Sequence, residues 1–246
     1  MAGGTINTLW MERRFIAFLI AEMTAIIFSL FCINFFPFPS FSTSARGLIF
    51  LESFRYAQVC SFTKTELRQQ LLNKRQSLPK KVWREKSDHL CRNLQSLPLF
   101  ASAKTVLAYT SFRQEPDLTP LFPTKDSWGL PRCVGKSLVW HRWQPSEPLK
   151  KGAYGILEPN ANFPILEAQD VDLILIPAVG CDRRGYRLGY GGGFYDRLLS
   201  SPQWQDKPTI AIVFEFALVS ELPVDSWDKP LQGVCTEVGF SSFLSN

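Results

Sequence analysis

The sequence lacks the histidine and cysteine patterns that mark common metalloenzymes. Only two histidines occur, His89 and His141, and neither belongs to an HExxH motif. The six cysteines stand singly with no CxxC pair, which argues against a zinc site and a disulfide framework. A GxSxG nucleophile elbow is also absent. These absences disfavour zinc-dependent and serine-dependent chemistry, and the single cysteines indicate a reducing compartment, so we expect a cytoplasmic location.

Charge of either sign is modest. The 27 basic and 22 acidic residues leave a net charge of +5, which suits an anionic substrate. No arginine-rich tract and no alternation of aromatic and basic residues occurs, so we expect no nucleic-acid partner. With 46% hydrophobic and 20% charged residues, a chain of 246 residues can bury a substantial core in one large domain or two small ones.

The first 61 residues differ from the rest of the chain. Phe15–Phe36 is almost continuously apolar, and its length is typical of a transmembrane helix or of the apolar part of a targeting signal. However, Glu22 would be costly inside a bilayer, and no clear cleavage site follows. We favour a third interpretation, in which translation starts further on. Membrane association is therefore expected only if residues 15–36 are genuine, and the organised domain is expected over 62–246.

Apolar periodicity in 62–246 predicts an α/β domain. Helices are expected from Thr63 to Leu78, where Pro79 follows, and from Lys80 to Leu97. Short runs rich in branched residues are typical of buried strands in a parallel sheet. The expected strands are 104–109, 128–134, 137–143, 171–176, 209–214 and 234–237.

A glycine-rich segment follows the apolar run of Val171–Ile176. It contains Arg187, Gly189 and three consecutive glycines at 191–193, and an amphipathic helix starts at Phe194. A strand, a glycine-rich loop and a helix in this order present backbone N–H groups to a phosphate. Neither a Walker A motif nor a dinucleotide fingerprint is present. The alternative interpretation is a flexible surface loop with a capping aspartate, Asp196.

The string PAVGCDRRGYRLGYGGGFYDRLL, residues 177–199, resembles the glycine-rich segment of 5-formyltetrahydrofolate cyclo-ligases, also called 5,10-methenyltetrahydrofolate synthetases. The resemblance extends in separate blocks over roughly residues 62–240. It implies a monomeric α/β domain whose central, mainly parallel sheet is flanked by helices, similar to the sugar-phosphate isomerase and coenzyme A transferase folds. It also implies ATP-dependent conversion of 5-formyltetrahydrofolate to 5,10-methenyltetrahydrofolate, with release of ADP and phosphate.

The resemblance also implies where ATP, folate and Mg²⁺ bind. The implied ATP-binding residues are Lys64, Arg68, Arg75, Arg187, Leu188, Gly189, Tyr190, Gly191, Gly192, Gly193, Phe194 and Tyr195. The implied folate-binding residues are Glu115, Tyr154, Tyr190 and Phe194. Asp196 is the implied Mg²⁺ ligand, and no covalent nucleophile is implied. Without the resemblance, Lys64, Arg68 and Arg75, which lie on one face of the first helix, would be interpreted as a solvated face.

One departure from the family concerns the metal. Some members carry an aspartate, thought to assist the metal, at the position of Gln232. An amide is a poorer Mg²⁺ ligand than a carboxylate, so we expect Asp196 and the ATP phosphates to hold the ion. Two alternative functions stay open from the sequence: an isomerase or transferase of the same fold that works without ATP, and a folate-binding protein without catalytic activity.

Overall fold

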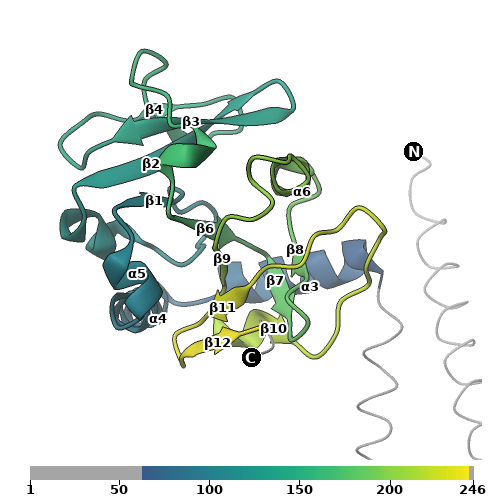
Figure 1. Ribbon diagram of the computed structural model, residues 1–246. Helices are drawn as coiled ribbons and strands as arrows, with labels where there is room; N and C mark the ends of the chain where they lie inside the picture. Colours follow the sequence, from purple (N-terminus) through teal and green to yellow (C-terminus); the bar gives the residue numbers. More distant parts are fainter. Residues whose placement is uncertain (1–62, 244–246) are drawn as a thin grey trace, which may run out of the picture. The chain divides into compact units, whose positions relative to one another are not determined.

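The computed structural model describes residues 63–243 (Figure 1). The chain divides into two units, Met1–Arg55 and Tyr56–Asn246, and all described residues belong to the second. Among the described residues, none of the helices is long and apolar enough to cross a membrane. The predicted apolar segment 15–36 lies outside the described residues.

Both predicted N-terminal helices are confirmed. They are α3 (Lys64–Gln76) and α4 (Lys80–Gln95), and a third, short helix, α5 (Pro98–Ser102), follows them. Thr63 starts α3 with a capping box, in which its side chain accepts from the Glu66 N–H and the Glu66 side chain accepts from the Thr63 N–H. Ser77 and Leu78 end the helix before Pro79, which cannot continue it.

A seven-stranded sheet forms the centre of the domain, in the order β12-β11-β9-β6-β1-β2-β3. Its strands are β1 (Thr105–Leu107), β2 (Ser127–Val134), β3 (Ser137–Trp143), β6 (Leu173–Pro177), β9 (Thr209–Ile212), β11 (Gly233–Cys235) and β12 (Phe240–Ser242). The five inner strands are parallel, and the two edge strands, β3 and β12, are antiparallel to their neighbours. The predicted α/β class with a mainly parallel sheet is confirmed.

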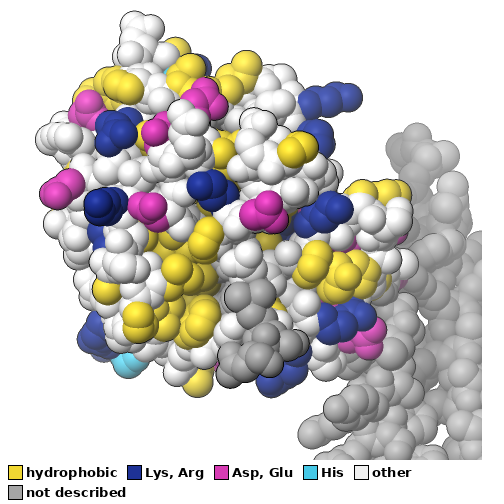
Figure 2. Space-filling model, in the orientation of Figure 1, with side chains coloured by type: hydrophobic (Ala, Val, Ile, Leu, Met, Phe, Trp, Pro, Cys, Tyr) yellow, Lys and Arg dark blue, Asp and Glu magenta, His cyan; other side chains and the backbone are white. Residues whose placement is uncertain are grey.

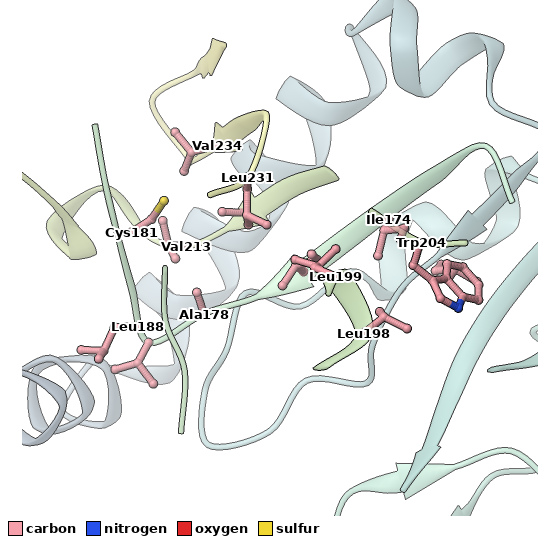
Figure 3. Packing of buried hydrophobic residues seen from close by; sticks show 14 of the residues in the cluster. Ile174, Ala178, Cys181, Leu188, Leu198, Leu199, Trp204, Val213, Leu231 and Val234 are labelled. Carbon is pink, nitrogen blue, oxygen red and sulfur yellow. The ribbon is translucent and has the colours of Figure 1, made fainter. Parts of the chain in front are cut away.

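Both faces of this sheet are buried, which explains the unbroken apolar runs in its strands. Successive residues of β6 enter opposite clusters: Leu173 and Leu175 pack on one face, and Ile174 and Ile176 pack on the other. Helices α4 and α5 cover the first face, while α3 and α6 (Phe194–Leu199) cover the second (Figure 1). Figure 3 shows Leu198 and Leu199 of α6 near Ile174 within the second cluster.

Smaller elements surround the sheet. They are β4 (Lys150–Lys151), β5 (Leu157–Glu158), β7 (Gly180–Asp182), β8 (Arg187–Leu188) and β10 (Leu218–Val219), with the 3-10 turns η1 (Thr119–Thr124), η2 (Ala168–Asp170) and η3 (Glu215–Ala217). On the face shown in Figure 2, basic and acidic side chains are interspersed rather than gathered by sign. The carboxyl end of β1 leads into the 108–118 loop. The carboxyl end of β6 leads into the β7–β8 hairpin, and the glycine-rich loop follows that hairpin. Because β1 and β6 are parallel neighbours, the two segments begin at the same edge of the sheet.

Candidate functional site

A cavity of about 1080 Å³ opens at this edge of the sheet. It brings together all but one of the site residues expected from the sequence. The expected residues on its wall are Lys64, Arg68, Glu115, Tyr154, Arg187, Leu188, Gly189, Tyr190, Gly191, Gly192, Gly193, Phe194, Tyr195 and Asp196. Such a volume is at the upper end of ordinary small-molecule sites, so it can hold a large ligand or two ligands side by side.

The glycine-rich loop, residues 189–193, connects β8 to α6 and forms one wall of the cavity. Gly191 and Gly193 have φ values of +98° and +65°, a region that side chains disfavour. Arg68 of α3 contacts this loop directly, because its Nε donates to the Gly189 carbonyl oxygen at 2.7 Å. The basic helix and the loop, 121 positions apart in the sequence, therefore lie side by side.

Arg187 lies beneath this loop with 5% of its side chain exposed. Its Nη2 donates to Oδ1 of Asp196 at 2.6 Å, and its guanidinium stacks over the Tyr195 ring at 5.3 Å. Its Nε is buried and has no hydrogen-bond partner among the described residues. A buried donor without a partner is costly, and this atom is one of two such side-chain atoms among the described residues.

Lys64 is held by two carboxylates that were not identified from the sequence. Its Nζ donates to Asp225 at 2.6 Å and also to Asp228, and all three side chains lie on the cavity wall. Desolvation lowers the pKa of Lys64, but the hydrogen bonds to Asp225 and Asp228 outweigh it and raise the pKa. Asp225 and Asp228 belong to an irregular segment without a motif, so their role depends on its path across the cavity.

Gln232 is not on the wall of the cavity. Its backbone N–H donates to Oγ1 of Thr209, at the start of β9, whereas the cavity lies at the carboxyl ends of the strands. The acidic groups that the C-terminal part of the chain supplies to the cavity are those of Asp225 and Asp228. The position of Gln232 away from the cavity is consistent with the expectation that Asp196 and the ATP phosphates, rather than residue 232, hold the ion.

Glu115 is buried at the inner end of the cavity, with 4% of the residue exposed. Its carboxylate accepts from the backbone N–H of Phe112 at 3.1 Å. Burial raises the pKa of Glu115 to about 7, although Arg75, the Phe112 N–H and the Tyr190 hydroxyl each lower it. The side chain is thus a proton acceptor or hydrogen-bond acceptor whose charge changes near neutral pH.

Arg75 differs from the other predicted site residues because it does not line the cavity. Only 3% of the residue is exposed, and its donors are directed at protein atoms: the Arg113 and Ala178 carbonyl oxygens and the Tyr190 hydroxyl. The sequence carries a signal for this burial. Leu67, Leu71 and Arg75 recur every fourth residue, so Arg75 continues the apolar, core-facing stripe of α3.

Aromatic side chains form the other side of the cavity. Tyr154, between β4 and β5, is 56% exposed and packs edge-on against Phe194, with 5.8 Å between ring centroids. Phe112 lies against Tyr190 in a tilted arrangement, with 6.2 Å between centroids and an angle of 57° between the ring planes. A planar ring system of a ligand can therefore enter between exposed aromatic faces at this end, while the cationic groups lie around the glycine-rich loop.

Comparison with known proteins places this site in a family. The family model described as the 5-formyltetrahydrofolate cyclo-ligase family matches residues 61–237. The chain is 32% identical over 189 residues to the Mycolicibacterium smegmatis 5-formyltetrahydrofolate cyclo-ligase, covering 71% of this chain and 93% of that relative. It is 29% identical over 173 residues to the Escherichia coli K12 enzyme of the same name, covering 66% and 94%.

A solved structure agrees with these relatives. The NMR structure of Aquifex aeolicus 5,10-methenyltetrahydrofolate synthetase superposes with a TM-score of 0.68 at 35% identity, covering 75% of this chain and 95% of that one. The matched region includes both the basic helix and the glycine-rich loop that form the cavity. The chain belongs to the 5-formyltetrahydrofolate cyclo-ligase family.

Proposed function

We propose that this protein converts 5-formyltetrahydrofolate to 5,10-methenyltetrahydrofolate with consumption of ATP. The observation that carries the proposal is the single cavity in which a cation-rich, glycine-rich wall adjoins an aromatic wall with a buried carboxyl group. The first wall suits a triphosphate, and the second suits the flat, hydrogen-bonding ring of a folate. Membership of the cyclo-ligase family supports the same pairing of substrates.

The chemistry needs both ligands in one cavity. The formyl oxygen on N5 is a poor leaving group, so it must first receive the γ-phosphoryl group of ATP, which releases ADP. N10 then attacks the activated carbon, the carbon–oxygen bond breaks with loss of phosphate, and N10 gives up its proton. Phosphoryl transfer is catalysed mainly by positioning and by neutralisation of charge, and no covalent protein nucleophile is required.

The phosphates are assigned to Lys64, Arg68, Arg187 and the backbone N–H groups of the loop. Arg68 donates to the Gly189 carbonyl oxygen of the loop, and Arg187 donates to the carboxylate of Asp196, in the helix that follows the loop. The Arg187 guanidinium lines the cavity and can pair with phosphate oxygens there. Glu115, Tyr154, Tyr190 and Phe194 are assigned to the folate.

Mg²⁺ is assigned to Asp196 together with the ATP phosphates. Within residues 63–243 there is no group of three or more His, Cys, Asp or Glu residues that could hold a metal ion by itself. Mg²⁺ commonly takes one or two carboxylates plus substrate phosphates, which fits this donor set. The carboxylates of Asp225 and Asp228 line the same cavity and are further oxygen donors available to the ion. When bound, the metal neutralises charge on the transferred phosphoryl group.

The test is a cyclisation assay with 5-formyltetrahydrofolate, followed by the absorbance of the methenyl product. Product is expected only with ATP and Mg²⁺ present, and a chelator should stop the reaction. Product without ATP would instead indicate an isomerase or transferase, the class suggested by the expected likeness to sugar-phosphate isomerase and coenzyme A transferase folds. Tight folate binding without product would indicate a binding protein.

Replacing Lys64 with methionine is expected to raise the KM for ATP about ten- to a hundredfold, the scale of one charged hydrogen bond. The substitution removes a cation from the triphosphate wall and leaves Asp225 and Asp228 to repel the phosphates. Steady-state kinetics with varied ATP measures the change. Lys74→Met is the matched control, because Lys74 lies on the same helix but over the Phe216 ring and outside this cavity. An equal rise in KM for both variants would contradict the assignment.

We further propose that residues 62–246 are the catalytic domain and that residues 1–61 are an extension not needed for activity. A chain beginning at residue 62 is then expected to keep full cyclisation activity. Intact-mass measurement and fractionation of the native protein test whether the extension is present and whether the protein is cytoplasmic, as expected.

A further inference from the structure

Arg75 connects three separate segments at the inner end of the cavity. Its Nε donates to the Arg113 carbonyl oxygen at 3.1 Å, and its Nη1 donates to the Ala178 carbonyl oxygen at 3.3 Å. Its Nη2 donates to the Tyr190 hydroxyl, and its guanidinium lies 5.6 Å from the centre of that ring. The three acceptors belong to the loop after β1, the segment after β6 and the glycine-rich loop.

The Tyr190 hydroxyl extends this connection to Glu115. It accepts from Arg75, which leaves its own hydrogen free, and it lies close enough to the Glu115 carboxyl group to lower the pKa of that group. The guanidinium and the hydroxyl therefore both act on this carboxyl group. Tyr190 is also on the cavity wall within the glycine-rich loop, so Arg75 and Tyr190 together join the triphosphate wall to the folate wall.

The loop that carries Glu115 needs such support. Arg113 and Gln114 have φ values of +47° and +56°, which is unusual for residues other than glycine. Strained backbone persists only where its surroundings determine it, at a cost of about 1–3 kcal/mol per residue. Arg75 holds the Arg113 carbonyl oxygen, while Trp83 Nε1 and Ser111 Oγ both donate to the Glu115 carbonyl oxygen.

We propose that Arg75 is a positioning residue that binds neither substrate: through the Tyr190 hydroxyl it ties the glycine-rich loop to the Glu115 loop, so that the ATP and folate sites share one geometry. This inference rests on the proposed function for its kinetic consequences but not for the contacts that define it. It replaces the expectation that Arg75 reaches the ATP phosphates. That role would need Arg75 on the cavity wall, where it does not lie.

The groups that face Glu115 allow a test by pH. They are Arg75 from α3, Tyr190 from the glycine-rich loop, Tyr109 after β1 and Tyr195 from α6. The pKa of each tyrosine is raised, primarily by burial, so all three stay neutral, and among the described residues Arg75 is the cation that lowers the pKa of Glu115. Arg75 lowers the pKa of Glu115, and removing that cation must raise it.

The experiment compares Arg75→Gln, Arg75→Lys and Tyr190→Phe with the wild type in full-length protein. Each variant is expected to raise the KM for ATP and the KM for folate together, each by about three- to tenfold.

Arg75→Gln should also move the lower limb of the pH profile of kcat/KM for folate upward by about one unit or more. Arg75→Lys keeps the positive charge but cannot make all three hydrogen bonds of the guanidinium, so its pH profile should stay nearer that of the wild type. In a double-mutant cycle, Arg75→Lys and Tyr190→Phe should be less than additive.

A rise in the KM for ATP alone, with an unmoved pH profile, would overturn the proposal and restore Arg75 as a phosphate ligand. If Arg75→Gln does not fold, the double-mutant cycle of Arg75→Lys and Tyr190→Phe decides, because Tyr190 also lines the cavity and strictly additive effects would contradict the connection. Arg84→Lys is the matched control: Arg84 pairs with Asp117 at 2.5 Å beside the same loop but does not contact Tyr190, so its profile should not move. Carbon-13 NMR titration of Glu115, assigned with Glu115→Gln, reports the same shift even if the wild type shows no cyclisation.

Discussion

Replacing Arg187 with methionine is expected to lower kcat/KM for ATP by about two to three orders of magnitude, the loss typical of removing one preorganised donor to developing negative charge. Arg187 is buried, its Nε has no partner within residues 63–243, and its pair with Asp196 holds the guanidinium beneath the glycine-rich loop. Methionine keeps most of the packing against Tyr195 but no charge. Steady-state kinetics at saturating folate measures the change.

Arg184→Met is the matched control for this experiment. Arg184 lies three residues earlier in the same hairpin and also pairs with a buried carboxylate, Asp182, at 2.8 Å, but it is not on the cavity wall. Its loss is expected to cost stability, since Asp182 is left buried without its partner, while the kcat/KM of the folded enzyme stays near that of the wild type. Similar losses of kcat/KM in the two variants would show that the hairpin responds as a whole and that Arg187 has no special role.

Gly191→Ala is expected to reduce kcat/KM for ATP by about ten- to a hundredfold. An added Cβ would meet no atom closer than Arg68 Cζ at 3.9 Å, so the effect comes from the backbone rather than from a clash. At a φ of +98° an alanine is strained, and relaxation of the loop would displace the N–H groups that face the cavity. Misplacement by about 1 Å can cost about a hundredfold in rate.

Gly135→Ala separates this effect from a general loss of stability. Gly135, in the turn between β2 and β3, has a φ of +59°, and an added Cβ would meet no atom within 4 Å. Both alanines should lower the free energy of unfolding by about 1–2 kcal/mol, as thermal or urea denaturation would measure. Only Gly191→Ala should change the kinetics. Full activity of Gly191→Ala at the same loss of stability would remove the loop from the ATP site.

Several parts of the domain were predictable because the interactions that define them are local. The Thr63–Glu66 capping box and Pro79 delimit α3 within a few residues. The run Leu173–Ile176, apolar at every position, is explained by burial on both faces of a parallel sheet. The glycine-rich segment requires backbone conformations that side chains disfavour, and its string of residues also carries the family resemblance.

The remaining parts depended on which distant segments meet. Lys64, Arg68 and Arg75 of α3 look alike in sequence. In the folded chain, Arg75 is buried against Tyr190, while Lys64 is held by Asp225 and Asp228. Gln232 likewise lies at the opposite end of the strands from the cavity, a position that its sequence neighbours do not indicate.

Local signals along the chain were therefore enough to predict the fold class, the family and the two segments that lie side by side at the site. The contacts of each charged side chain there depend on how the chain folds. Apolar periodicity, helix capping and glycine conformation depend on a few neighbouring residues, so they can be recognised in the sequence. Burial and charge pairing, as for Glu115, are set by residues far along the chain, so their consequences appear only when the chain has folded.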